Sequence, residues 1–433
     1  MILAGLLQTQ IHDTLKGVPD LQGRRLAVAD IPKAGWNLLR GDLPFPVATL
    51  DADALRSNGL WMRRFAERHG VQVCPHGKTT MAPQLFSRQM ADGAWGITVS
   101  TVQQMRVCVK HGVKRVLMAN QLVHERDIHE VLEALRADAT LDFRCLVDSA
   151  DNVRRLRDCA ASADIGRPLQ VLLEGGVVGG RTGCRSLAEA MQLAELIDEC
   201  HPLLALTGVE GFEGVIDATD DGEAAVAVDR FIGLLCELMS GLAGRGLLHV
   251  ERPVLTIGGS IFFDLVVSHP AVLGLRDRCE VVLRSGCYLT HDSLMLRDNM
   301  RRMAGRSPQL GFADEAFRPA LAVWGLVQSM PEPGLAIVNV GKRDVSHDID
   351  LPIVERWFRR GLHTSPVAMP EPVTTTQIND QHLFLRVTAG TRLRIGDVVG
   401  LGVSHPCTTF DRWRLLHVID ERFDVVEGIL TFF

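Results

Sequence analysis

Short apolar runs alternate with amphipathic stretches through the first two thirds of the chain. Each apolar run ends in polar residues or glycine, and a stretch with helical periodicity follows it. Alternating strands and helices predict a parallel sheet. About eight such units in roughly 230 residues fit a closed (β/α)8 barrel, with an open doubly wound sheet as the alternative. The predicted strands are 71–74, 96–99, 115–118, 143–147, 170–173, 206–209, 254–257 and 280–283, and predicted helices include 83–91, 152–161, 187–199 and 224–242.

The pattern changes after about residue 289, where strand-like runs follow one another with few helical stretches between them. Prolines and glycines separate these runs, which indicates a mostly antiparallel β domain. An earlier strand-like run, 44–50, could join the same domain. We therefore expect an N-terminal segment (1–50) associated with the β domain, a barrel (51–300) and a C-terminal β domain (301–433). The runs after residue 289 are 320–327, 335–340, 383–387, 398–403 and 425–432.

Composition narrows the classes of partner. The chain has 433 residues, 46% hydrophobic and 23% charged, which is typical of a soluble globular protein with more than one domain. A net charge of -6 with interspersed signs argues against nucleic acid. No apolar run approaches the roughly 18 residues of a membrane helix, and the N-terminus lacks the features of a signal peptide. Ten cysteines without CxxC spacing predict reduced thiols of a cytoplasmic protein, all but Cys407 and Cys287 being buried hydrophobes.

A lysine follows the first predicted barrel strand. The segment runs from Cys74 through His76 to Lys78 and Thr79, and catalytic groups of barrels collect where strands end. We expect Lys78 to lie where solvent is scarce, because burial disfavours the ammonium form and a neutral amine is what Schiff-base chemistry requires. The alternative is a lysine that extends to solvent or pairs with a carboxylate.

Glycine-rich turns follow the fifth, seventh and eighth predicted strands. The fifth turn carries Arg181, which could donate to an anionic or phenolic oxygen. Loops after strands seven and eight of a barrel often bind phosphate, and glycine amides together with a serine hydroxyl suit a phosphate dianion. The alternative is a set of tight turns that need glycine only for their backbone geometry. The residues of the last two turns are Gly258, Gly259 and Ser260, and then Arg284, Gly286, Cys287 and Tyr288.

The β domain contains His405 and Cys407, two positions apart. If this segment is a strand, both side chains point to one face and could share a borderline-soft cation such as zinc. Two protein ligands would leave positions for water, for substrate or for a third ligand. On its own, such a pair is more often a surface histidine beside a buried cysteine.

Together these motifs resemble the D-serine dehydratase and D-threonine aldolase family of alanine-racemase-like, fold-type III pyridoxal-phosphate enzymes. The lysine motif, Pro75 to Thr79, is similar to the family's proline, histidine, variable residue, lysine and threonine. The resemblance extends from about Pro46 to the C-terminus. One departure concerns substrate: many members continue the motif with histidine, where this chain has Thr80 and Met81. The other matching motifs are 96–101, the glycine pairs, Arg284-x-Gly286-x-Tyr288, Asp380-Gln381-His382 and His405-x-Cys407.

The resemblance implies a cofactor, a metal and a partner subunit. Pyridoxal phosphate would be bound covalently to Lys78, and zinc would be the usual metal on His405 and Cys407. Such enzymes commonly form homodimers in which the β domain of one subunit covers the barrel mouth of the other. The substrate would be a small D-amino acid. Beside Lys78, the implied cofactor-binding residues are His76, Arg181, Gly258, Gly259, Ser260, Gly286, Cys287 and Tyr288.

Three reactions are open for such a site. Lys78 would take the Cα proton, and the metal would act on the β-hydroxyl. Loss of the hydroxyl would convert a D-hydroxyamino acid such as D-serine to a keto acid and ammonia. Deprotonation of the hydroxyl would instead give retro-aldol cleavage, as with D-threonine. Racemisation needs a second acid/base, which in alanine racemases is a tyrosine of the β domain, and the one tyrosine here is Tyr288.

Two further classes remain as alternatives. Some fold-type III proteins serve cofactor homeostasis without turnover, but those are typically single barrels without a β domain. A metal-dependent barrel hydrolase would want carboxylates and histidines at strand ends, which here are rich in glycine. Polar residues that could line the mouth, or serve as loop caps and core groups, are Asn120, Gln121, Asp148 and Glu213.

Overall fold

A ring of eight parallel strands forms the first part of the molecule. The computed structural model describes residues 3–216, 220–312 and 317–433. The strands hydrogen-bond in the order β4-β11-β10-β9-β8-β7-β6-β5. A parallel bridge between His76 and Thr98 joins the two ends of this order, so the sheet closes into a barrel. The strands are β4 (Gln72–Val73), β5 (Ile97–Val99), β6 (Arg115–Gln121), β7 (Asp142–Val147), β8 (Leu169–Gly175), β9 (Leu204–Gly211), β10 (Val254–Thr256) and β11 (Glu280–Leu283).

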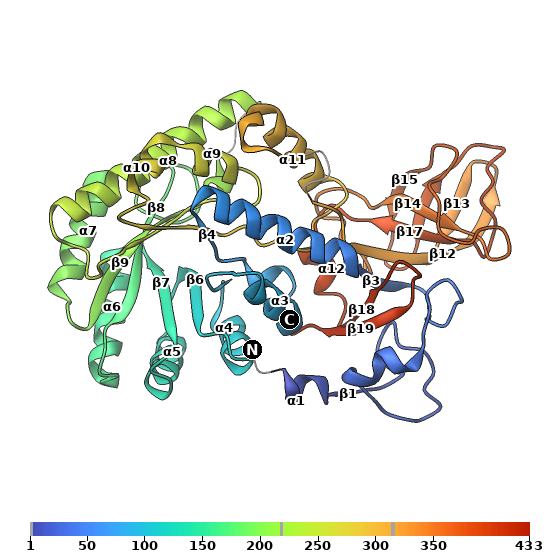
Figure 1. Cartoon of the computed structure of the whole chain (residues 1–433), viewed down its shortest axis with the longest axis horizontal. Helices are drawn as coiled ribbons and strands as arrows, with labels where there is room; N and C mark the ends of the chain where they lie inside the picture. The colour runs from blue at the N-terminus through green and yellow to red at the C-terminus, as the bar shows by residue number, and fades with distance from the viewer. Residues whose placement is uncertain (1–2, 217–219, 313–316) are drawn as a thin grey trace.

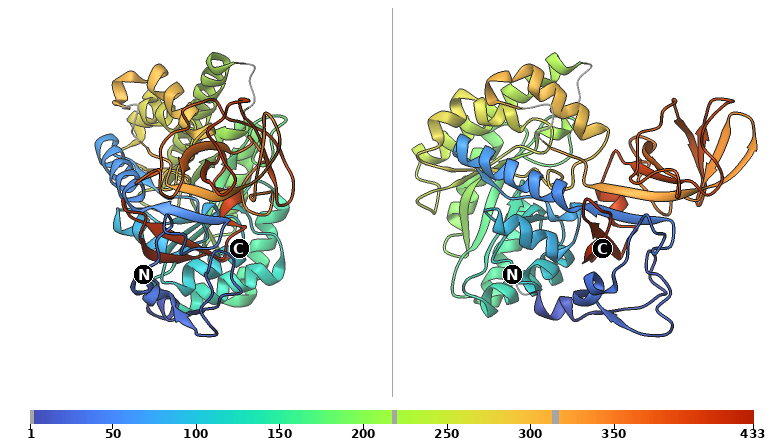
Figure 2. Two further views of the ribbon diagram at one scale, coloured as in Figure 1. Left: turned by 90° about the vertical axis from the view of Figure 1, so that its right-hand side faces the viewer. Right: turned by 45° about the vertical axis from the view of Figure 1, so that its right-hand side comes forward.

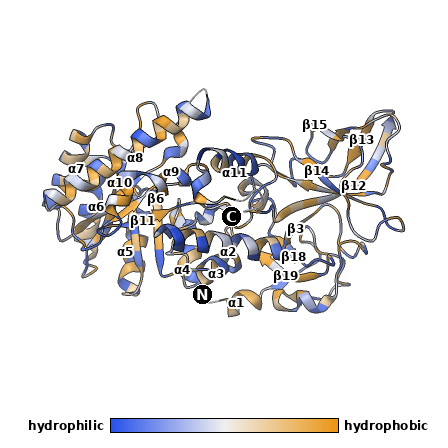
Figure 3. Ribbon diagram, turned by 45° about the horizontal axis from the view of Figure 1, so that its top comes forward, coloured by the Kyte–Doolittle hydropathy of each residue, from blue (hydrophilic) through white to orange (hydrophobic). Residues whose placement is uncertain are grey.

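Helices surround this ring (Figure 1) and follow the strands along the chain. The strands near β11 are coloured hydrophobic in Figure 3, as expected for strands buried on both faces. The helices are α2 (Ala52–His69), α3 (Pro83–Ala91), α4 (Val102–Lys110), α5 (Glu125–Ala137), α6 (Ala150–Ala163), α7 (Leu187–Glu199), α8 (Asp221–Gly244), α9 (Phe263–Ser268) and α10 (Pro270–Leu275).

The barrel predicted from the sequence is confirmed. Each of the eight predicted strands overlaps one strand of the ring, and α3 and α7 have the predicted bounds. The helix starts follow ordinary capping chemistry: Thr101, Ser149 and Ser186 each accept a hydrogen bond from a backbone N–H of the first helical turn. The open doubly wound sheet is excluded by the closing bridge between His76 and Thr98.

The second part is a nine-stranded sheet beside the barrel (Figure 2). In the described chain its pairings are antiparallel except that β3 runs parallel to β18. The indole N–H of Trp324 donates to Thr49 Oγ1 (2.8 Å), which ties β3 to β12. The predicted mostly antiparallel β domain is confirmed. The strands are β3 (Val47–Asp51), β12 (Leu321–Glu332), β13 (Leu335–Val338), β14 (Ile353–Phe358), β15 (Thr374–Ile378), β16 (Leu383–Arg386), β17 (Val398–Gly402), β18 (Leu415–Ile419) and β19 (Val425–Leu430).

Several elements were not predicted. Strand β15 is largely exposed and polar, and β14 contains Glu355 and Arg356, so neither shows a clear apolar pattern. Helix α11 (Met295–Arg306) connects the two parts and is coloured hydrophilic in Figure 3. The remaining elements are α1 (Ala4–Leu7), β1 (Gln10–Ile11), β2 (Leu26–Ala27), α12 (Cys407–Phe410) and the 3-10 helices η1 (Val28–Ala34), η2 (Gly77–Thr79), η3 (Glu213–Val215) and η4 (Pro308–Leu310).

Two structural features bear on what the composition predicted: the burial of the cysteines and the hydropathy of the helices. All ten cysteines are free thiols and eight are buried; the two that are partly exposed are Cys287 and Cys407, as predicted. Within the residues that the structure describes, no helix combines the length and apolar character that crossing a bilayer requires.

Candidate active site

Lys78 lies on the 3-10 turn η2, directly after the first barrel strand. Its side chain is exposed in the single chain, so the expectation that solvent would be scarce around it is wrong for this subunit alone. The reason is local: the tight turn after β4 directs Lys78 out of the ring of strands, while its neighbours Gly77 and Thr79 are buried. Among the described residues Lys78 Nζ has no hydrogen-bond or ion-pair partner.

A cavity of about 190 Å³ opens beside Lys78, and we call it the Lys78 cavity. It gathers residues from opposite ends of the chain, because α12 of the β domain packs against η2. Of the predicted site residues, Arg181, Gly258 and Tyr288 are not part of its lining. Those that line it are His76, Lys78, Gly259, Ser260, Gly286, Cys287, His405 and Cys407, together with Thr79, Phe212, Glu213 and Arg284.

His76 forms one wall of the cavity. Its Nε2 lies 3.2 Å from Ser100 Oγ, while its buried Nδ1 has no hydrogen-bond partner in the described chain. Burial, followed by the positive charge of Lys78, holds the pKa of His76 well below its usual value, so the ring is neutral. The ring is therefore an uncharged, partly unsatisfied surface beside Lys78, which suits a flat, polar cofactor.

Gly286 permits the close approach of the β11 and β4 strand ends. A Cβ atom there would lie 2.8 Å from His76 Cβ and 2.9 Å from the His76 carbonyl oxygen. We expect Gly286→Ala to lower stability by about 1–3 kcal/mol, as overpacking does. It should also weaken binding of the pyridoxal phosphate that the family resemblance implies, because Gly286 is one of the implied cofactor-binding residues and its backbone would shift. Urea unfolding and a cofactor titration would measure both effects.

The matched control for this substitution is Gly274→Ala in α10, where an added Cβ meets no atom within 4 Å. A helical alanine there should be neutral or slightly stabilising. If the two variants behaved alike, the close approach at Gly286 would not matter for the site.

The carboxylate of Glu213 accepts from two amides of the predicted phosphate turn. The N–H of Gly259 donates to Oε1 (2.6 Å) and the N–H of Gly258 donates to Oε2 (3.1 Å). Glu213 is fully buried. The two glycine amides thus converge on an anion, but that anion belongs to the protein. Gly258 and Gly259 are therefore removed from the set of amides that could hold a phosphate in this arrangement.

Four other amides around the cavity could hold a phosphate. The backbone N–H groups of Ser260, Ile261, Gly286 and Cys287 have no partner within the described part of the chain. All four residues line the Lys78 cavity. Unpaired amides from two adjacent loops suit a phosphate dianion. The residues present therefore fit pyridoxal phosphate, with its phosphate on these four amides and its ring near His76 and Lys78.

A buried ion pair lies beneath the cavity. Arg284 contacts Glu210, and both side chains are almost fully buried, at 5% and 1% exposure. Arg284 also donates to the Gly211 carbonyl oxygen (3.0 Å). Burial raises the pKa of Glu210 to about 7, an effect that the charge of Arg284 opposes. The pair fixes the ends of β9 and β11 relative to each other.

His405 and Cys407 enter the cavity from the β domain. Cys407 begins α12, so the expectation that both lie on a strand is wrong. Pro406 is the cause, because proline cannot contribute an N–H to a strand ladder and favours a helix start. A hydrogen bond with Cys407, supported by Asp348, raises the pKa of His405 to about 9. Hydrogen bonds from neighbouring groups, Cys287 first and then His405, hold the pKa of the Cys407 thiol well below its usual value.

Two family models match this chain. The alanine racemase N-terminal domain matches residues 50–252, and the putative serine dehydratase domain matches residues 320–419. The chain is 26% identical to a D-threonine aldolase from Arthrobacter sp. over 94% of its own length and 96% of that protein. The chain thus combines a match to the alanine racemase N-terminal domain with a match to the putative serine dehydratase domain, in that order. This confirms the family predicted from the lysine and His-x-Cys motifs, and with it an enzyme of the lyase class that uses pyridoxal phosphate.

Solved structures of family members share the fold. The D-threo-3-hydroxyaspartate dehydratase from Delftia sp. HT23 superposes with a TM-score of 0.71 at 22% identity, covering 92% of this chain and 99% of that one. A D-threonine aldolase from Filomicrobium marinum gives a TM-score of 0.70 at 21% identity, covering 92% and 96%. A cysteine-to-alanine mutant of a D-threo-3-hydroxyaspartate dehydratase, described as metal-free, gives 0.72 at 22% identity, covering 92% and 99%.

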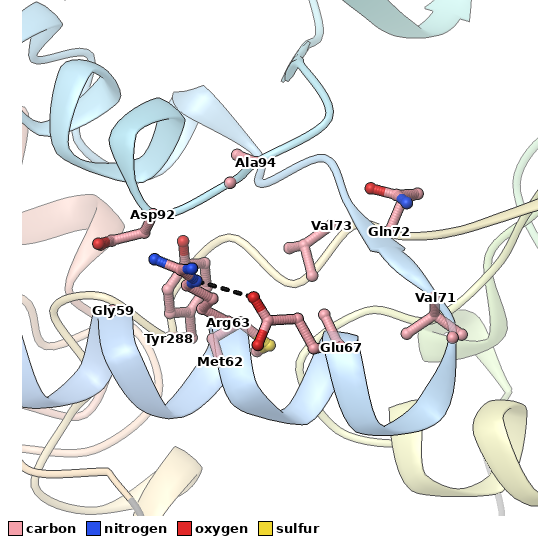
Figure 4. A pocket seen from close by; sticks show the side chains of 13 residues that line it. Gly59, Met62, Arg63, Glu67, Val71, Gln72, Val73, Asp92, Ala94 and Tyr288 are labelled. Carbon is pink, nitrogen blue, oxygen red and sulfur yellow. Dashed lines mark hydrogen bonds and ion pairs between the residues drawn. The ribbon is translucent and has the colours of Figure 1, made fainter.

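Tyr288 does not reach the site that this family motif suggested. Tyr288 is not part of the Lys78 cavity lining, and its ring lines a second cavity between α2 and the loop after α3 (Figure 4). Burial raises the pKa of Tyr288 far above its usual value. The neighbour Cys287 faces the Lys78 cavity instead, because successive side chains at the end of β11 point in different directions. Tyr288 is thus a core residue in this structure.

Arg181 lies outside the lining as well. Its guanidinium group lies 4.7 Å from the centre of the Phe212 ring, and Phe212 lines the cavity. Its positive charge contributes to the lowered pKa of His76, after burial, Lys78 and Arg284. Arg181 therefore contacts Phe212, a lining residue, and does not line the cavity itself. Its predicted contact with the cofactor stays a prediction.

Most of the other polar candidates serve the scaffold. Asn120 donates to the Ser100 carbonyl oxygen (3.1 Å), Gln121 contacts Glu174, and Asp148 accepts from the Gly183 amide (3.0 Å). Glu213 is the exception and lines the cavity. Sequence reasoning missed Phe212, Asp348 and the role of Glu210 as the partner of Arg284, because nothing in the sequence links these three positions to the motifs that they support.

Proposed function

We propose that the protein is a pyridoxal-phosphate lyase that dehydrates and deaminates a D-3-hydroxy amino acid such as D-serine to a keto acid and ammonia. The observation that carries the proposal is one cavity lined by Lys78, by four unpaired amides and by the His405–Cys407 pair. The relatives support it, since they include dehydratases and aldolases named for D-3-hydroxy amino acids. These are the 3-hydroxy-D-aspartate aldolase of Paracoccus denitrificans and the D-threo-3-hydroxyaspartate dehydratase of Delftia sp.

The residues of the barrel would hold the cofactor and move one proton. Bound pyridoxal phosphate supplies an electron sink for charge that develops at Cα. The amides of Ser260, Ile261, Gly286 and Cys287 would hold its phosphate, and Lys78 would hold it covalently. Lys78 Nζ would also take the Cα proton of the substrate. Its amine is exposed, follows His76 by two residues and has no partner in the part of the chain that the structure describes, so it is free to do both.

The residues of the β domain would hold a metal. His405 Nδ1 lies 2.5 Å from Asp348 Oδ2, and a carboxylate on one imidazole nitrogen commonly orients the other toward a metal. Zinc fits an imidazole and a thiolate. It would supply a Lewis acid for the substrate hydroxyl. The related dehydratase is known as a cysteine mutant in a metal-free form, which supports a metal in that protein.

Aldol cleavage is the second candidate. It is favoured by the match with the D-threonine aldolase of Arthrobacter, which extends over nearly the whole length of both chains. Racemisation is less well supported, because the chain's single tyrosine, Tyr288, is buried away from the Lys78 cavity.

Product analysis tests the proposal. With D-serine, the purified protein should release pyruvate and ammonia, and a metal chelator should lower the rate at least about 100-fold, since the Lewis acid for the leaving hydroxyl is lost. Added zinc should restore the rate. Glycine and acetaldehyde from D-threonine, without pyruvate from D-serine, would favour the aldolase instead. Racemised serine without either product would contradict both.

The proposal includes the arrangement of the subunit. Residues 51–300 would form the cofactor domain, and residues 1–50 and 301–433 the β domain, consistent with the pairing of β3 with β12 and β18. A homodimer in which a second β domain covers the barrel mouth would bury Lys78, which is exposed in the single chain. Such a cover would exclude water from the reaction.

A further inference from the structure

Two thiols from distant parts of the chain meet in the Lys78 cavity. Cys287 follows β11 of the barrel and Cys407 begins α12 of the β domain, and their sulfur atoms lie 3.7 Å apart. They are also the two cysteines of the ten that are not buried. The hydroxyl oxygen of Thr79 lies 3.6 Å from the Cys287 sulfur and 3.5 Å from the Cys407 sulfur, so one group contacts both.

The distance between the sulfur atoms fits a shared metal better than a disulfide. A disulfide requires about 2.05 Å between sulfurs. Two thiolates that bind one zinc ion at about 2.3 Å with tetrahedral angles lie about 3.8 Å apart. The observed 3.7 Å, which in the single chain is the length of a hydrogen bond between the two thiols, is close to this second value.

The surroundings supply the rest of such a site. His405 is next to Cys407 in the cavity, and its Nδ1 is engaged by Asp348 Oδ2 at 2.5 Å, which leaves Nε2 for a metal. Asp348 is held in turn by Thr408, whose hydroxyl donates to Oδ1 (2.7 Å). A carboxylate behind a histidine ligand is a common outer shell of zinc sites.

We propose that Cys287 is a third protein ligand of the metal, which completes a His405, Cys407 and Cys287 site with its fourth position open to the substrate hydroxyl. This inference rests on the proposed function and specifies its metal. A ligand set of two thiolates and one imidazole selects zinc over magnesium or manganese, which prefer oxygen. Among the described residues no group of three histidine, cysteine or acidic side chains is already placed around a metal position, so the proposal requires His405, Cys407 and Cys287 to come together by side-chain rotation when zinc binds.

Cys287 would then bind both the phosphate of the cofactor and the metal. Its backbone N–H is one of the four unpaired amides proposed for the phosphate, and its side chain would bind the metal. The cofactor and the metal would thereby be fixed relative to each other by a single residue. The substrate hydroxyl at the metal would be held at a defined distance from Lys78, which suits proton removal at Cα.

Native alkylation tests the assignment without relying on activity. The purified full-length protein, prepared under reducing conditions, is treated with iodoacetamide with and without zinc, and modified cysteines are located by peptide mass spectrometry. Without zinc, Cys287 and Cys407 should react first, since the other eight are buried. Zinc should slow both at least about 10-fold, whereas magnesium at the same concentration should protect neither. Protection of Cys407 alone would overturn the proposal.

Zinc affinity provides the second measurement. Cys287→Ser should weaken zinc binding at least about 100-fold, beyond the 10–100-fold that loss of an outer-shell partner costs. The matched control is Cys200→Ser at the end of α7, which should leave zinc affinity unchanged. An unchanged affinity in Cys287→Ser, or a Cys287–Cys407 disulfide that persists when zinc is supplied, would refute the third ligand. The proposed function fails separately, by absence of a cofactor band or of keto acid in the wild type.

Discussion

Lys78→Ala should abolish the absorbance band near ~420 nm that marks pyridoxal phosphate held by a lysine. It should also lower the rate with D-serine by about 10⁴-fold or more, because the variant loses both the cofactor's anchor and the base that takes the Cα proton. The structure separates this effect from misfolding: the exposed Lys78 amine has no partner in the described chain, so its removal should change the free energy of unfolding by less than about 0.5 kcal/mol. Absorbance spectra, product assays and urea unfolding of the same preparation measure all three.

Lys110→Ala is the matched control for this prediction. Lys110 is also exposed but ends α4 on the outside of the barrel. That variant should keep the band and the rate. A band that persisted in Lys78→Ala would show that another lysine carries the cofactor. A wild type that gained no band when pyridoxal phosphate is supplied would contradict the assignment of the whole cavity.

The barrel could be predicted from the sequence because its strands are nearly continuous apolar runs. Most barrel strands are buried on both faces over most of their length, so consecutive residues are apolar, as in Leu204–Gly211. Strand β15 shows the opposite case. Its residues Thr374–Ile378 are mostly exposed, and only pairing with β16 makes them a strand. A pattern that arises from hydrogen bonding to a distant segment leaves no apolar signature in the segment itself.

The site was predictable only where chemistry is local. Residue type and spacing identify Lys78 and the His405–Cys407 pair as candidates, and the fold brings them into one cavity. The direction in which a side chain points could not be predicted from residue type. Cys287 and Tyr288 are neighbours, yet one faces the cavity and the other the core between α2 and α3. That choice depends on the turn after β11, which residue types do not specify.

Contacts between distant residues could not be read from the sequence at all. The carboxylate of Glu213 accepts hydrogen bonds from the amides of Gly258 and Gly259. Two amides that were predicted to bind phosphate are therefore already bonded to a carboxylate of the protein. A glycine turn after the seventh barrel strand was predicted, but the carboxylate that accepts from its amides was not. The partner of those amides depends on how the loop after β9 packs against the loop after β10, and this is a property of the assembled barrel.

Arg284→Met should destabilise the fold by about 3–5 kcal/mol, because it leaves a buried carboxylate without its cation. Glu210 is 1% exposed, and Arg284 is its partner beneath the Lys78 cavity. Methionine keeps the length of the stem, so lost packing contributes little. Urea unfolding at a fixed pH measures the loss. A loss below about 1 kcal/mol would mean that Glu210 finds another partner or is already neutral in the wild type.

The loss should also depend on pH in a defined direction. Burial raises the pKa of Glu210 to about 7 in the folded protein, above the value of about 4.3 expected when unfolded. The folded state therefore binds this proton more tightly than the unfolded state does. The contribution of Glu210 to the free energy of unfolding is largest below about pH 4 and declines as the pH rises through 7. Without Arg284 the pKa of Glu210 rises further, so the deficit of Arg284→Met should be smaller at pH 5.5 than at pH 8.

The double variant Arg284→Met with Glu210→Gln separates the charge from the packing. Removing both charges should recover a large part of the lost stability, because breaking a buried pair costs more than replacing it. It should also remove the difference between pH 5.5 and pH 8. A deficit that stayed equal at both pH values in the single variant, or that persisted in the double variant, would place the cost in the hydrogen bond from Arg284 to the Gly211 carbonyl. That bond would then be the main contribution of Arg284 to fixing the ends of β9 and β11, which both pair with β10.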